Sequence, residues 1–492
     1  MYLKTQSFFV LGVSKSGYAA ASFILSRGGK CCIYEELDSP KIAAAIAELT
    51  ARGAVRVTRE RAEEFIEKSD VLVISPGVPI NHEIAVAFKS AGKRIVGELE
   101  FGFECLMPPI IAVTGTNGKT TTVSLIKAIL DEAGEKSELL GNVGVPVSSR
   151  AEQIDCKTVC VAEVSSFQLE SVSDFKPHIA CVTNISPDHL TRHYTMENYI
   201  YLKRRILKNL KESEYAVLNY DDETVRSFEE GLRAKVVRVS VKERVAGAYS
   251  FGGAFYFYGE KIMERAEFPL LGEHNEYDAL FAIAAAKLAG INTETIARAL
   301  GGFRGVPHRV ELIAEVGGVK YYDDSKSTNT ASAVTAMRAM TAPTVVILGG
   351  SEKGEKYESL FAAMKASPVK HAVITGASRF SMFEAARNAG FTDVTVTADF
   401  RSAVGIAAML AGGGDAVLLS PACASFDEFS SYEERGEVFK KEVKELCGRL
   451  EKSAEEKAKS NETAEEKPEE KAETKTDGEN SDKKEEAECP RA

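Results

Sequence analysis

The residues best suited to chemistry lie in the stretch IAVTGTNGKTTT (111–122), where an apolar run leads into two glycines, Lys119 and three threonines. Glycines let backbone N–H groups close on a polyphosphate, and the N-terminus of a following helix adds positive potential. Lys119 supplies a mobile positive charge, and Thr120 offers a hydroxyl group to Mg²⁺. The stretch therefore predicts a phosphate-binding loop for ATP or GTP.

The spacing of this loop departs from the general pattern GxxxxGK[ST], because the residue five positions before Gly118 is Val113 and not glycine. A plain glycine-rich turn between a strand and a helix is the alternative. It is disfavoured because GKTT follows an apolar run directly and precedes a segment with one apolar helical face. We expect that helix to begin at Lys119 and to end at Gly134.

A site for a nucleoside triphosphate needs metal ligands, and the ends of neighbouring strands are the natural places to search. Glu163 ends the apolar run TVCVAEV, and His189 follows the run IACVTNI in the segment NISPDHLTRH. Either residue can equally be an ordinary exposed loop residue. Lys203, in ENYIYLKRRILKNL, would on its own be a solvated helix lysine.

The segments that would position these residues alternate between short β-rich apolar runs and helical patterns. Strands that alternate with helices imply parallel sheets with helices on both faces. Ligands bind at the carboxyl ends of such strands. The runs expected to be strands are residues 8–12, 71–75, 110–114, 159–164, 179–185, 215–219, 345–350, 372–376 and 416–420.

The length of 492 residues predicts about three domains. Boundaries are indicated by CLMPPI (105–110) and GFRGVPHR (302–309), after which the alternation starts afresh. The last segment has no Val, Ile, Leu, Met, Phe or Tyr and cannot bury a core. We expect an α/β chain with a Rossmann-like domain at 1–106, a central domain with a P-loop ATPase-like parallel sheet at 107–306, a second Rossmann-like domain at 307–450 and a disordered acidic tail at 451–492.

The first domain opens with FFVLGVSKSGYAA (8–20), a strand, a turn of glycine and serine and then a helix, which can also hold a phosphate group. The pattern GxxxxG is weak evidence by itself and is often only a Rossmann-like turn. A dehydrogenase is disfavoured because GxGxxG is absent and a complete phosphate loop follows.

The composition is that of an ordinary globular protein, with 44% hydrophobic and 27% charged residues. No apolar stretch reaches the roughly 18 residues of a membrane span, and the first residues lack signal-peptide features. We therefore expect a cytoplasmic protein without membrane insertion. Nine cysteines without a CxxC motif favour buried reduced thiols over disulfides or zinc. The net charge of −11 comes largely from the tail, and the mildly acidic body argues against nucleic-acid binding.

Nine motifs carry a resemblance to a known family: TGTNGKTT (114–121), GNVG (141–144), EVSSFQLE (163–170), NISPDHLTRH (184–193), YLKRRI (201–206), GEHN (272–275), PHR (307–309), DDSKSTN (323–329) and SPACASFDEF (420–429). Together they resemble the Mur ligase family, ATP-dependent enzymes that add amino acids to the peptidoglycan precursor. The resemblance covers about residues 1–450. SSFQLE and SPACASFD resemble the member that adds D-glutamate, whereas the other Mur ligases and the folylpolyglutamate synthases share only the ATP motifs.

The resemblance implies a reaction in two steps. ATP first phosphorylates the carboxylate of UDP-N-acetylmuramoyl-L-alanine, and D-glutamate then displaces phosphate. Two negatively charged reactants must meet, which requires Mg²⁺, with two sites implied, and cationic side chains around the phosphoryl group. A monomer without a nucleic-acid partner is expected.

By the same resemblance, Lys119 contacts the phosphates, Thr120 and Glu163 bind one Mg²⁺, and His189 holds a second. Lys203 matches a family lysine that CO₂ carbamylates, which turns a cation into an anionic oxygen ligand for the second metal. The further positions implied at the ATP site are Gly115, Thr116, Asn117, Gly118, Thr121, Asn275, Arg309 and Asp324.

The resemblance also implies a site for the UDP-linked substrate. The pattern near Glu35 and Glu36 departs from the enterobacterial relatives, so no uracil contact is assigned there. Asp278 stands where relatives often have a second Asn, which leaves the adenine contact at that position open. The positions implied for the UDP-linked substrate are Ser14, Lys15, Ser16, Ser75, Pro76, Gly77 and Asn142.

D-Glutamate brings two carboxylates, so its pocket needs two separated sets of donors. Ser351 replaces an acidic residue common in relatives and Tyr432 replaces an enterobacterial Phe, but neither change removes a donor. The positions implied for D-glutamate are Lys326, Thr328, Lys353, Ser425 and Phe426.

Two alternatives stay open. A ligase of the same family that adds another amino acid would keep every ATP motif and differ in the third domain. A catalytically dead nucleotide-binding protein would have lost one of Glu163, His189 or Lys203, and all three are present.

Overall fold

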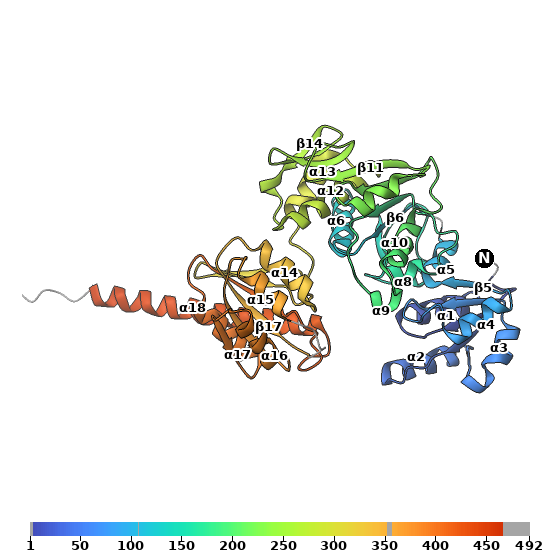
Figure 1. Cartoon of the computed structure of the whole chain (residues 1–492), viewed down its shortest axis with the longest axis horizontal. Coiled ribbons are helices and arrows are strands. Elements are labelled where there is room, and N and C mark those ends of the chain that lie inside the picture. Colours follow the sequence, from blue (N-terminus) through green and yellow to red (C-terminus); the bar gives the residue numbers. More distant parts are fainter. Residues whose placement is uncertain (1–2, 107, 352–356, 466–492) are drawn as a thin grey trace, which may run out of the picture.

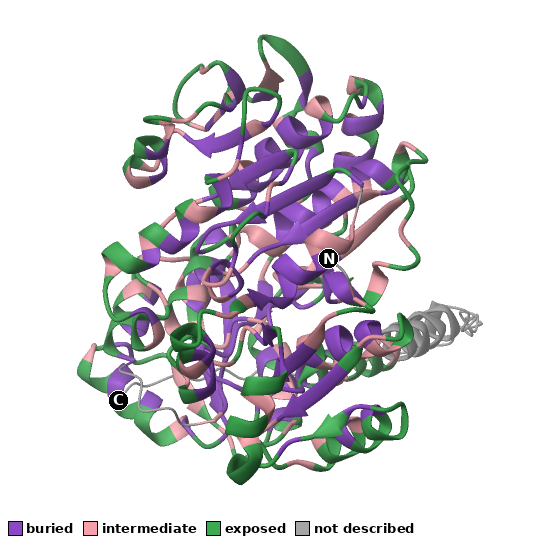
Figure 2. Cartoon of the chain, turned by 90° about the vertical axis from the view of Figure 1, so that its right-hand side faces the viewer, coloured by how far each residue is buried: buried purple, intermediate pink, exposed green. Residues whose placement is uncertain are grey.

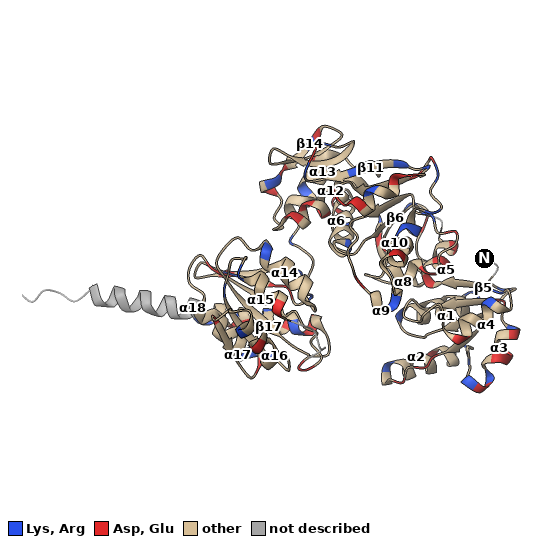
Figure 3. Ribbon diagram, in the orientation of Figure 1, with Lys and Arg blue, Asp and Glu red and all other residues tan. Residues whose placement is uncertain are grey.

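The computed structural model describes residues 3–106, 108–351 and 357–465, which fold into three sheets that follow one another along the chain (Figure 1). In a second view the strands are largely buried, and exposed segments lie mainly on the surrounding helices and loops (Figure 2). Acidic and basic residues are interspersed on each of the three units (Figure 3).

The first sheet is parallel throughout, with the order β3-β2-β1-β4-β5. Its strands are β1 (Ser7–Leu11), β2 (Lys30–Tyr34), β3 (Val55–Arg56), β4 (Val71–Ile74) and β5 (Arg94–Gly97). The helices of this unit are α1 (Lys15–Ser26), α2 (Pro40–Ala51), α3 (Ala62–Lys68), α4 (Glu83–Ser90) and α5 (Glu98–Cys105).

The second sheet has the order β14-β13-β12-β11-β10-β9-β6-β8-β7. Its strands are β6 (Ile110–Thr114), β7 (Ser137–Gly141), β8 (Val159–Glu163), β9 (Ile179–Val182), β10 (Tyr215–Asn219), β11 (Lys235–Ser240), β12 (Gly247–Phe251), β13 (Ala254–Phe257) and β14 (Glu260–Glu264). Its helices are α6 (Lys119–Glu132), α7 (Val147–Arg150), α8 (Ser166–Leu169), α9 (Leu190–His193), α10 (Met196–Arg204), α11 (Glu223–Arg226), α12 (Glu273–Leu288) and α13 (Thr293–Gly302).

The third sheet has the order β15-β16-β20-β17-β18-β19. Its strands are β15 (Glu311–Val316), β16 (Val319–Asp323), β17 (Thr344–Gly349), β18 (Val369–Thr375), β19 (Val394–Val396) and β20 (Ala416–Leu419). Its helices are α14 (Thr330–Ala339), α15 (Glu358–Met364), α16 (Arg379–Asn388), α17 (Phe400–Leu410) and α18 (Tyr432–Glu465).

Strand β6 shows how both faces of the second sheet are covered. Ile111 and Val113 pack into a cluster with residues of α6 and α12, whereas Ile110 and Ala112 pack into the cluster on the other face. A continuous apolar run suits this strand because a parallel sheet covered on both sides has no face in water. The predicted parallel sheets and the predicted helix after the phosphate loop are confirmed.

Three hairpins were not predicted. Strand β13 is antiparallel to both β12 and β14 at the edge of the second sheet, and β15 is antiparallel to β16. Their connections are only a few residues long and contain glycine, such as Gly317–Gly318. A parallel pair would need a crossover of a dozen or more residues, so short links force antiparallel pairing.

Helix α18 continues to Glu465, so the segment expected to be disordered begins as a helix, and residues 466–492 lie outside the described part. Residues 451–465 are rich in Ala, Glu and Lys, which favour helix. Within the described ranges, no helix has the length and apolar character to cross a membrane. The cysteines there are free thiols as predicted, but Cys156 is exposed and not buried.

Candidate active site

The phosphate loop has a backbone that only glycine fits at two positions. Gly115 and Gly118 have φ angles of 146° and 82°. A Cβ atom on Gly115 would lie 1.9 Å from Thr183 Oγ1, and one on Gly118 would lie 2.2 Å from Asp278 Oδ1. Asn184 accepts hydrogen bonds from the backbone N–H groups of the two residues between these glycines. Packing therefore holds the loop open for a phosphate group.

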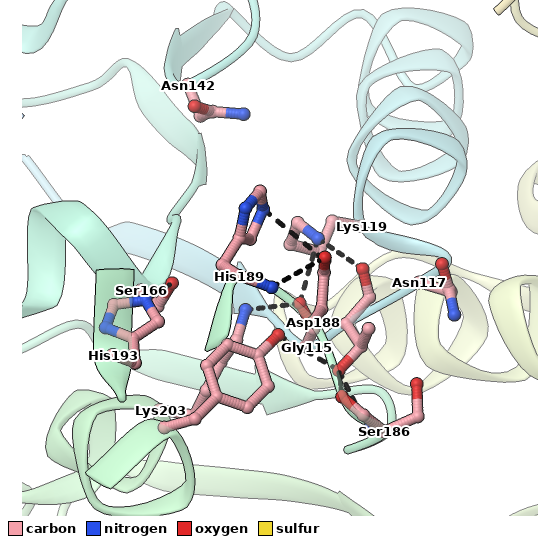
Figure 4. A network of polar contacts seen from close by, with 12 residues as sticks. Gly115, Asn117, Lys119, Asn142, Ser166, Ser186, Asp188, His189, His193 and Lys203 are labelled. Atoms are coloured by element: carbon pink, nitrogen blue, oxygen red, sulfur yellow. Dashed lines mark hydrogen bonds and ion pairs between the residues drawn. The ribbon is translucent and has the colours of Figure 1, made fainter. Parts of the chain in front are cut away.

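Lys119 and Lys203 bring two ammonium groups to the same carbonyl oxygen. Lys119 Nζ donates to the backbone oxygens of Gly115 and Thr116 at 2.8 and 2.7 Å. Lys203 Nζ, from α10, donates to the Gly115 oxygen and lies 3.5 Å from Thr114 Oγ1. Figure 4 shows both side chains approaching Gly115 from different sides. From the sequence alone, Lys203 could be a solvated helix lysine. In the structure its side chain is buried, and the residue is only 2% exposed.

Burial changes the protonation of both lysines. Burial, and after it the neighbouring Lys119 charge, lower the pKa of the Lys203 ammonium group to about 6, against the attraction of Asp188 and Glu163. Burial also lowers the pKa of Lys119, opposed mainly by Glu163. Lys203 is therefore largely a neutral amine at neutral pH, and a neutral amine is a nucleophile.

This burial predicts a pH-dependent stability. Between the folded-state pKa of about 6 and the usual lysine value of 10.5, the unfolded chain binds one proton more than the folded chain at Lys203. The free energy of unfolding should therefore rise with pH through this window by about 1.4 kcal/mol per pH unit from this group. Denaturant unfolding of the wild type and Lys203→Met in CO₂-free buffer across this window measures it. If plots of the free energy of unfolding against pH stay parallel for the two proteins, the predicted effect of Lys203 burial on stability is wrong.

Glu163 links the phosphate loop to the turn after β7. Thr120 Oγ1 donates to Glu163 Oε2 at 2.7 Å, and Asn142 Nδ2 donates to Glu163 Oε1 at 2.6 Å. Arg309 Nη2 lies 3.3 Å from Thr120 Oγ1. A carboxylate beside a hydroxyl group is the hard oxygen set that Mg²⁺ prefers, so Glu163 and Thr120 fit a magnesium ion.

His189 lies on the surface next to Asp188. Asp188 was not among the site residues predicted from the sequence. The His189 imidazole is about half exposed, and its Nε2 lies 3.4 Å from Asp188 Oδ2. The residue has a left-handed backbone with φ of 52° at the start of α9. In Figure 4 both side chains lie near Lys119. The acid directly before a candidate metal-binding histidine was the signal that could have identified Asp188.

A cavity of about 470 Å³ lies between the second and third units. Asn275 donates to Leu271 O at 2.6 Å, and Ser420 donates to Asp324 at 2.7 Å. Burial raises the pKa of Asp324 to about 7. The residues implied for ATP that line this cavity are Asn117, Gly118, Thr121, Asn275, Arg309 and Asp324.

Asp278 also lines this cavity, and its carboxyl group lies against the phosphate loop. Thr122 Oγ1 donates to Asp278 Oδ1 at 3.1 Å. Burial raises the pKa of Asp278 to about 7, with Thr122 and Arg309 opposing the rise. The position left open by sequence analysis therefore holds a buried carboxyl group that supports the loop.

A second cavity, of about 380 Å³, lies between the first and second units. Lys15 Nζ donates across it to Gly144 O at 2.6 Å, and Ser75 Oγ donates to Gly12 O at 2.8 Å. The predicted residues that line it are all seven implied for the UDP-linked substrate: Ser14, Lys15, Ser16, Ser75, Pro76, Gly77 and Asn142. Glu35, Glu36 and His82 line it as well, and no role was assigned to them from the sequence.

The positions implied for D-glutamate lie on loops of the third unit. Lys326 Nζ lies 3.8 Å from the centre of the Tyr432 ring, and burial lowers its pKa. Ser425 is buried, whereas Phe426 is 72% exposed. Thr328 is half-buried, and Lys353 lies outside the described residues.

Arg435 joins two of these loops, and sequence analysis missed it. Its guanidinium group is buried and donates to Ser325 Oγ at 3.0 Å and to Cys423 O at 3.1 Å. Ser325 lies in the loop of Lys326, and Cys423 lies in the loop of Ser425. An arginine at the start of a charged helix resembles a solvated residue in sequence, so nothing in the pattern indicated its burial.

A phosphate loop at the carboxyl edge of a parallel sheet, between two cavities, is typical of enzymes that use a nucleoside triphosphate. Three family models match the chain: the MurD-like N-terminal domain of Mur ligases at 6–97, the Mur ligase middle domain at 113–286 and the Mur ligase glutamate ligase domain at 308–423.

Curated relatives match over nearly their whole length. The UDP-N-acetylmuramoylalanine--D-glutamate ligase of Caldanaerobacter subterraneus subsp. tengcongensis is 38% identical, covering 91% of this chain and 100% of the relative. The ligase of the same name from Pelotomaculum thermopropionicum is 40% identical, covering 89% and 97%. That of Clostridioides difficile is 36% identical, covering 91% and 100%. The chain therefore belongs to the Mur ligase family.

Solved structures share the fold at low identity. The UDP-N-acetylmuramate-alanine ligase MurC of Thermotoga maritima superposes with a TM-score of 0.58 at 16% identity, covering 90% of this chain and 100% of that chain. A pseudomurein peptide ligase type C from Methanothermus fervidus superposes with a TM-score of 0.54 at 18% identity, covering 90% and 100%. These likenesses support the three-sheet architecture.

Proposed function

We propose that this chain ligates D-glutamate to UDP-N-acetylmuramoyl-L-alanine at the expense of ATP, in the synthesis of the peptidoglycan precursor. One observation carries the proposal. Asn142 lines the second cavity and bonds Glu163, which in turn bonds Thr120 of the phosphate loop. The second cavity is therefore connected through Asn142 and Glu163 to the phosphate loop, so a substrate in that cavity could extend its carboxylate toward the γ-phosphoryl group. The names of the relatives supply the substrates.

The chemistry explains why the site carries so many cations. A carboxylate does not accept an amine at neutral pH because its leaving group would be oxide, and phosphorylation supplies a workable leaving group. The γ-phosphoryl group then has to approach an anion. Lys119 and Arg309 lie beside the phosphate loop and would offset this repulsion, since Lys119 bonds the loop carbonyls and Arg309 contacts Thr120.

Thr120 and Glu163 are the residues that would hold Mg²⁺, and His189 with a modified Lys203 would hold a second ion. Bound Mg²⁺ would neutralise charge that develops on the phosphate oxygens. Glu163 also accepts a hydrogen bond from the Asn142 amide and so orients a side chain that lines the second cavity.

We expect carbamylation of Lys203 because its side-chain amine is largely neutral and therefore nucleophilic. The nitrogen of Lys203 would attack CO₂, an N–C bond forms, one proton leaves and an anionic carbamate results. This conversion would place an anionic oxygen donor where the neutral amine stands. The carbamate would also attract the neighbouring Lys119 cation.

We assign the UDP-linked substrate to residues 1–106, ATP to residues 107–306 and D-glutamate to residues 307–450. Lys326 and Ser425 lie on two loops that Arg435 joins, which supports one shared pocket for the two carboxylates of D-glutamate. We further infer a cytoplasmic location, since the UDP-linked substrate and ATP are cytoplasmic metabolites. The monomeric state stays a prediction that rests on the family resemblance.

Ser425 provides a test of the amino-acid site. We expect Ser425→Ala to raise the KM for D-glutamate about tenfold or more and the KM for ATP little, because a hydrogen bond to a carboxylate is worth about 1.5–3 kcal/mol. Ser367→Ala is the matched control, because Ser367 precedes β18 of the same sheet and its hydroxyl group bonds nearby residues, donating to Met364 O and accepting from Val369 N–H. Equal rises in both KM values would show that the third unit has been misassigned.

The ligation itself is tested by mass spectrometry of the product formed from ATP, UDP-N-acetylmuramoyl-L-alanine and D-glutamate. A product heavier by one glutamyl residue is expected, in amounts equal to the ADP formed. A product with another amino acid from an equimolar mixture would indicate a different ligase of the same family.

A further inference from the structure

Arg192 bridges two units of the chain with a single guanidinium group. Its Nε and Nη2 atoms donate to the two carboxylate oxygens of Glu170 at 3.1 and 2.6 Å. Nη2 also donates to Val78 O at 3.0 Å, and Nη1 lies 3.5 Å from Gly77 O. Arg192 and Glu170 belong to the second unit, whereas Gly77 and Val78 belong to the first. Figure 1 shows α9, which carries Arg192, beside the first unit.

The ion pair between Arg192 and Glu170 lies against a buried histidine. His193 is fully buried, and its Nε2 lies 2.9 Å from Ser166 Oγ while Nδ1 lies 3.5 Å from Glu170 Oε1. The His193 and Ser166 side chains face each other in Figure 4. The Arg192 and Glu170 side chains are only 19% and 11% exposed. A two-pronged ion pair with this little exposure is stronger and better oriented than a pair on the surface.

The loop that Arg192 reaches borders the second cavity. Pro76, Gly77 and Val78 line that cavity, and Val78 N–H donates to Ser75 O at 3.0 Å to close a turn. The carbonyl oxygens of this turn are bonded by Arg192, so its shape depends on a side chain from the second unit. Lys15, on the first unit, reaches the second unit at Gly144.

Helix α9, which carries Arg192, also begins next to a residue of the candidate reaction centre. His189 precedes α9, and Arg192 follows it by three residues. Glu170 directly follows α8, seven residues after Glu163. A fixed link between Arg192 and Glu170 therefore joins the turn of His189, the segment after Glu163 and the loop at Gly77.

We propose that Arg192, oriented by Glu170, is a positioning residue that fixes the Ser75–Val78 turn relative to the His189 turn. A UDP-linked substrate anchored in the second cavity then presents its far carboxylate to the phosphate loop. This inference rests on the proposed function. Misplacement of a reacting group by about 1 Å costs roughly a hundredfold in rate, so such a link affects catalysis without touching substrate.

Steady-state kinetics of the full chain test the inference with Arg192→Met, which keeps an unbranched apolar stem but donates no hydrogen bond. Arg298→Met is the matched control, because Arg298 pairs with Glu132 at 2.9 Å on an exposed surface. We expect Arg192→Met to lower kcat about tenfold or more. We also expect it to raise the KM for UDP-N-acetylmuramoyl-L-alanine about tenfold or more and the KM for ATP less than about twofold. Arg192→Lys should recover part of the loss, and Glu170→Gln combined with Arg192→Met should add little. An unchanged KM, or equal rises in both KM values, overturns the inference.

Hydrogen exchange of the ligand-free protein separates this inference from the proposed function. Backbone amides of residues 71–82 should exchange faster in Arg192→Met than in the wild type or Arg298→Met. If this difference is present but the wild type does not ligate, the proposed function fails while the link stands. If no difference is seen, the positioning role is wrong whatever the enzyme ligates.

Discussion

Replacement of Lys203 by alanine is expected to remove nearly all ligation, and a small carboxylate such as acetate is expected to restore part of it. The ammonium group lies beside Lys119 and a carbonyl oxygen in a buried site, where its positive charge is disfavoured. A carbamate would supply an anionic oxygen there, and acetate carries the same kind of oxygen. Loss of about 3 kcal/mol on the barrier corresponds to roughly a hundredfold in rate.

Lys208→Ala is the matched control, because Lys208 lies in the same segment and is exposed. It should turn over like the wild type. Rates measured with and without added acetate, and with and without added bicarbonate, separate the carbamate from a simple structural loss. Normal turnover of Lys203→Ala would show that the lysine only packs against the loop.

Lys119→Ala is expected to retain less than about a tenth of the turnover while the fold survives. Within the described part of the chain, Lys119 Nζ donates to carbonyl oxygens of its own loop, those of Gly115 and Thr116. Burial already disfavours its charge, so its removal should cost the fold little. The triphosphate, in contrast, loses the cation nearest to its transferred group.

The measurement is kcat with saturating substrates, together with thermal unfolding of the same preparations. Lys127→Ala is the control on the same helix, since Lys127 pairs with Asp131 at the surface. A tenfold loss corresponds to about 1.4 kcal/mol on the barrier. If Lys119→Ala retains more than a tenth of the activity and unfolds normally, the assignment of Lys119 to the phosphate site is wrong.

The elements that carry the site could be predicted because their patterns are local. The apolar run of β6, the glycines after it and the apolar face of α6 specify strand, loop and helix within 25 residues. The same is true of the turn at Ser14–Ser16. The seven residues implied for the UDP-linked substrate converge on one cavity because they lie at carboxyl ends of strands or in the turns that follow.

The residues whose roles were missed or left open make contacts over long sequence distances. Asp278, whose role was left open, supports Gly118 from α12, and Arg435 joins two loops from the start of α18. Arg192 reaches a turn more than a hundred residues away. Each is a charged residue that local pattern assigns to solvent, and only tertiary packing reveals its burial. The hairpins formed by β12, β13 and β14 were also missed, because these strands are only four or five residues long.

Phosphate release from ATP tests the central claim most directly. The purified full chain is incubated with UDP-N-acetylmuramoyl-L-alanine and, in separate reactions, with D-glutamate, L-glutamate, L-alanine or L-lysine. We expect sustained release only when the UDP-linked substrate and D-glutamate are both present. Release that depends on an L-amino acid would contradict the assignment of D-glutamate to the third unit, and release independent of the UDP-linked substrate would contradict the assignment of the second cavity.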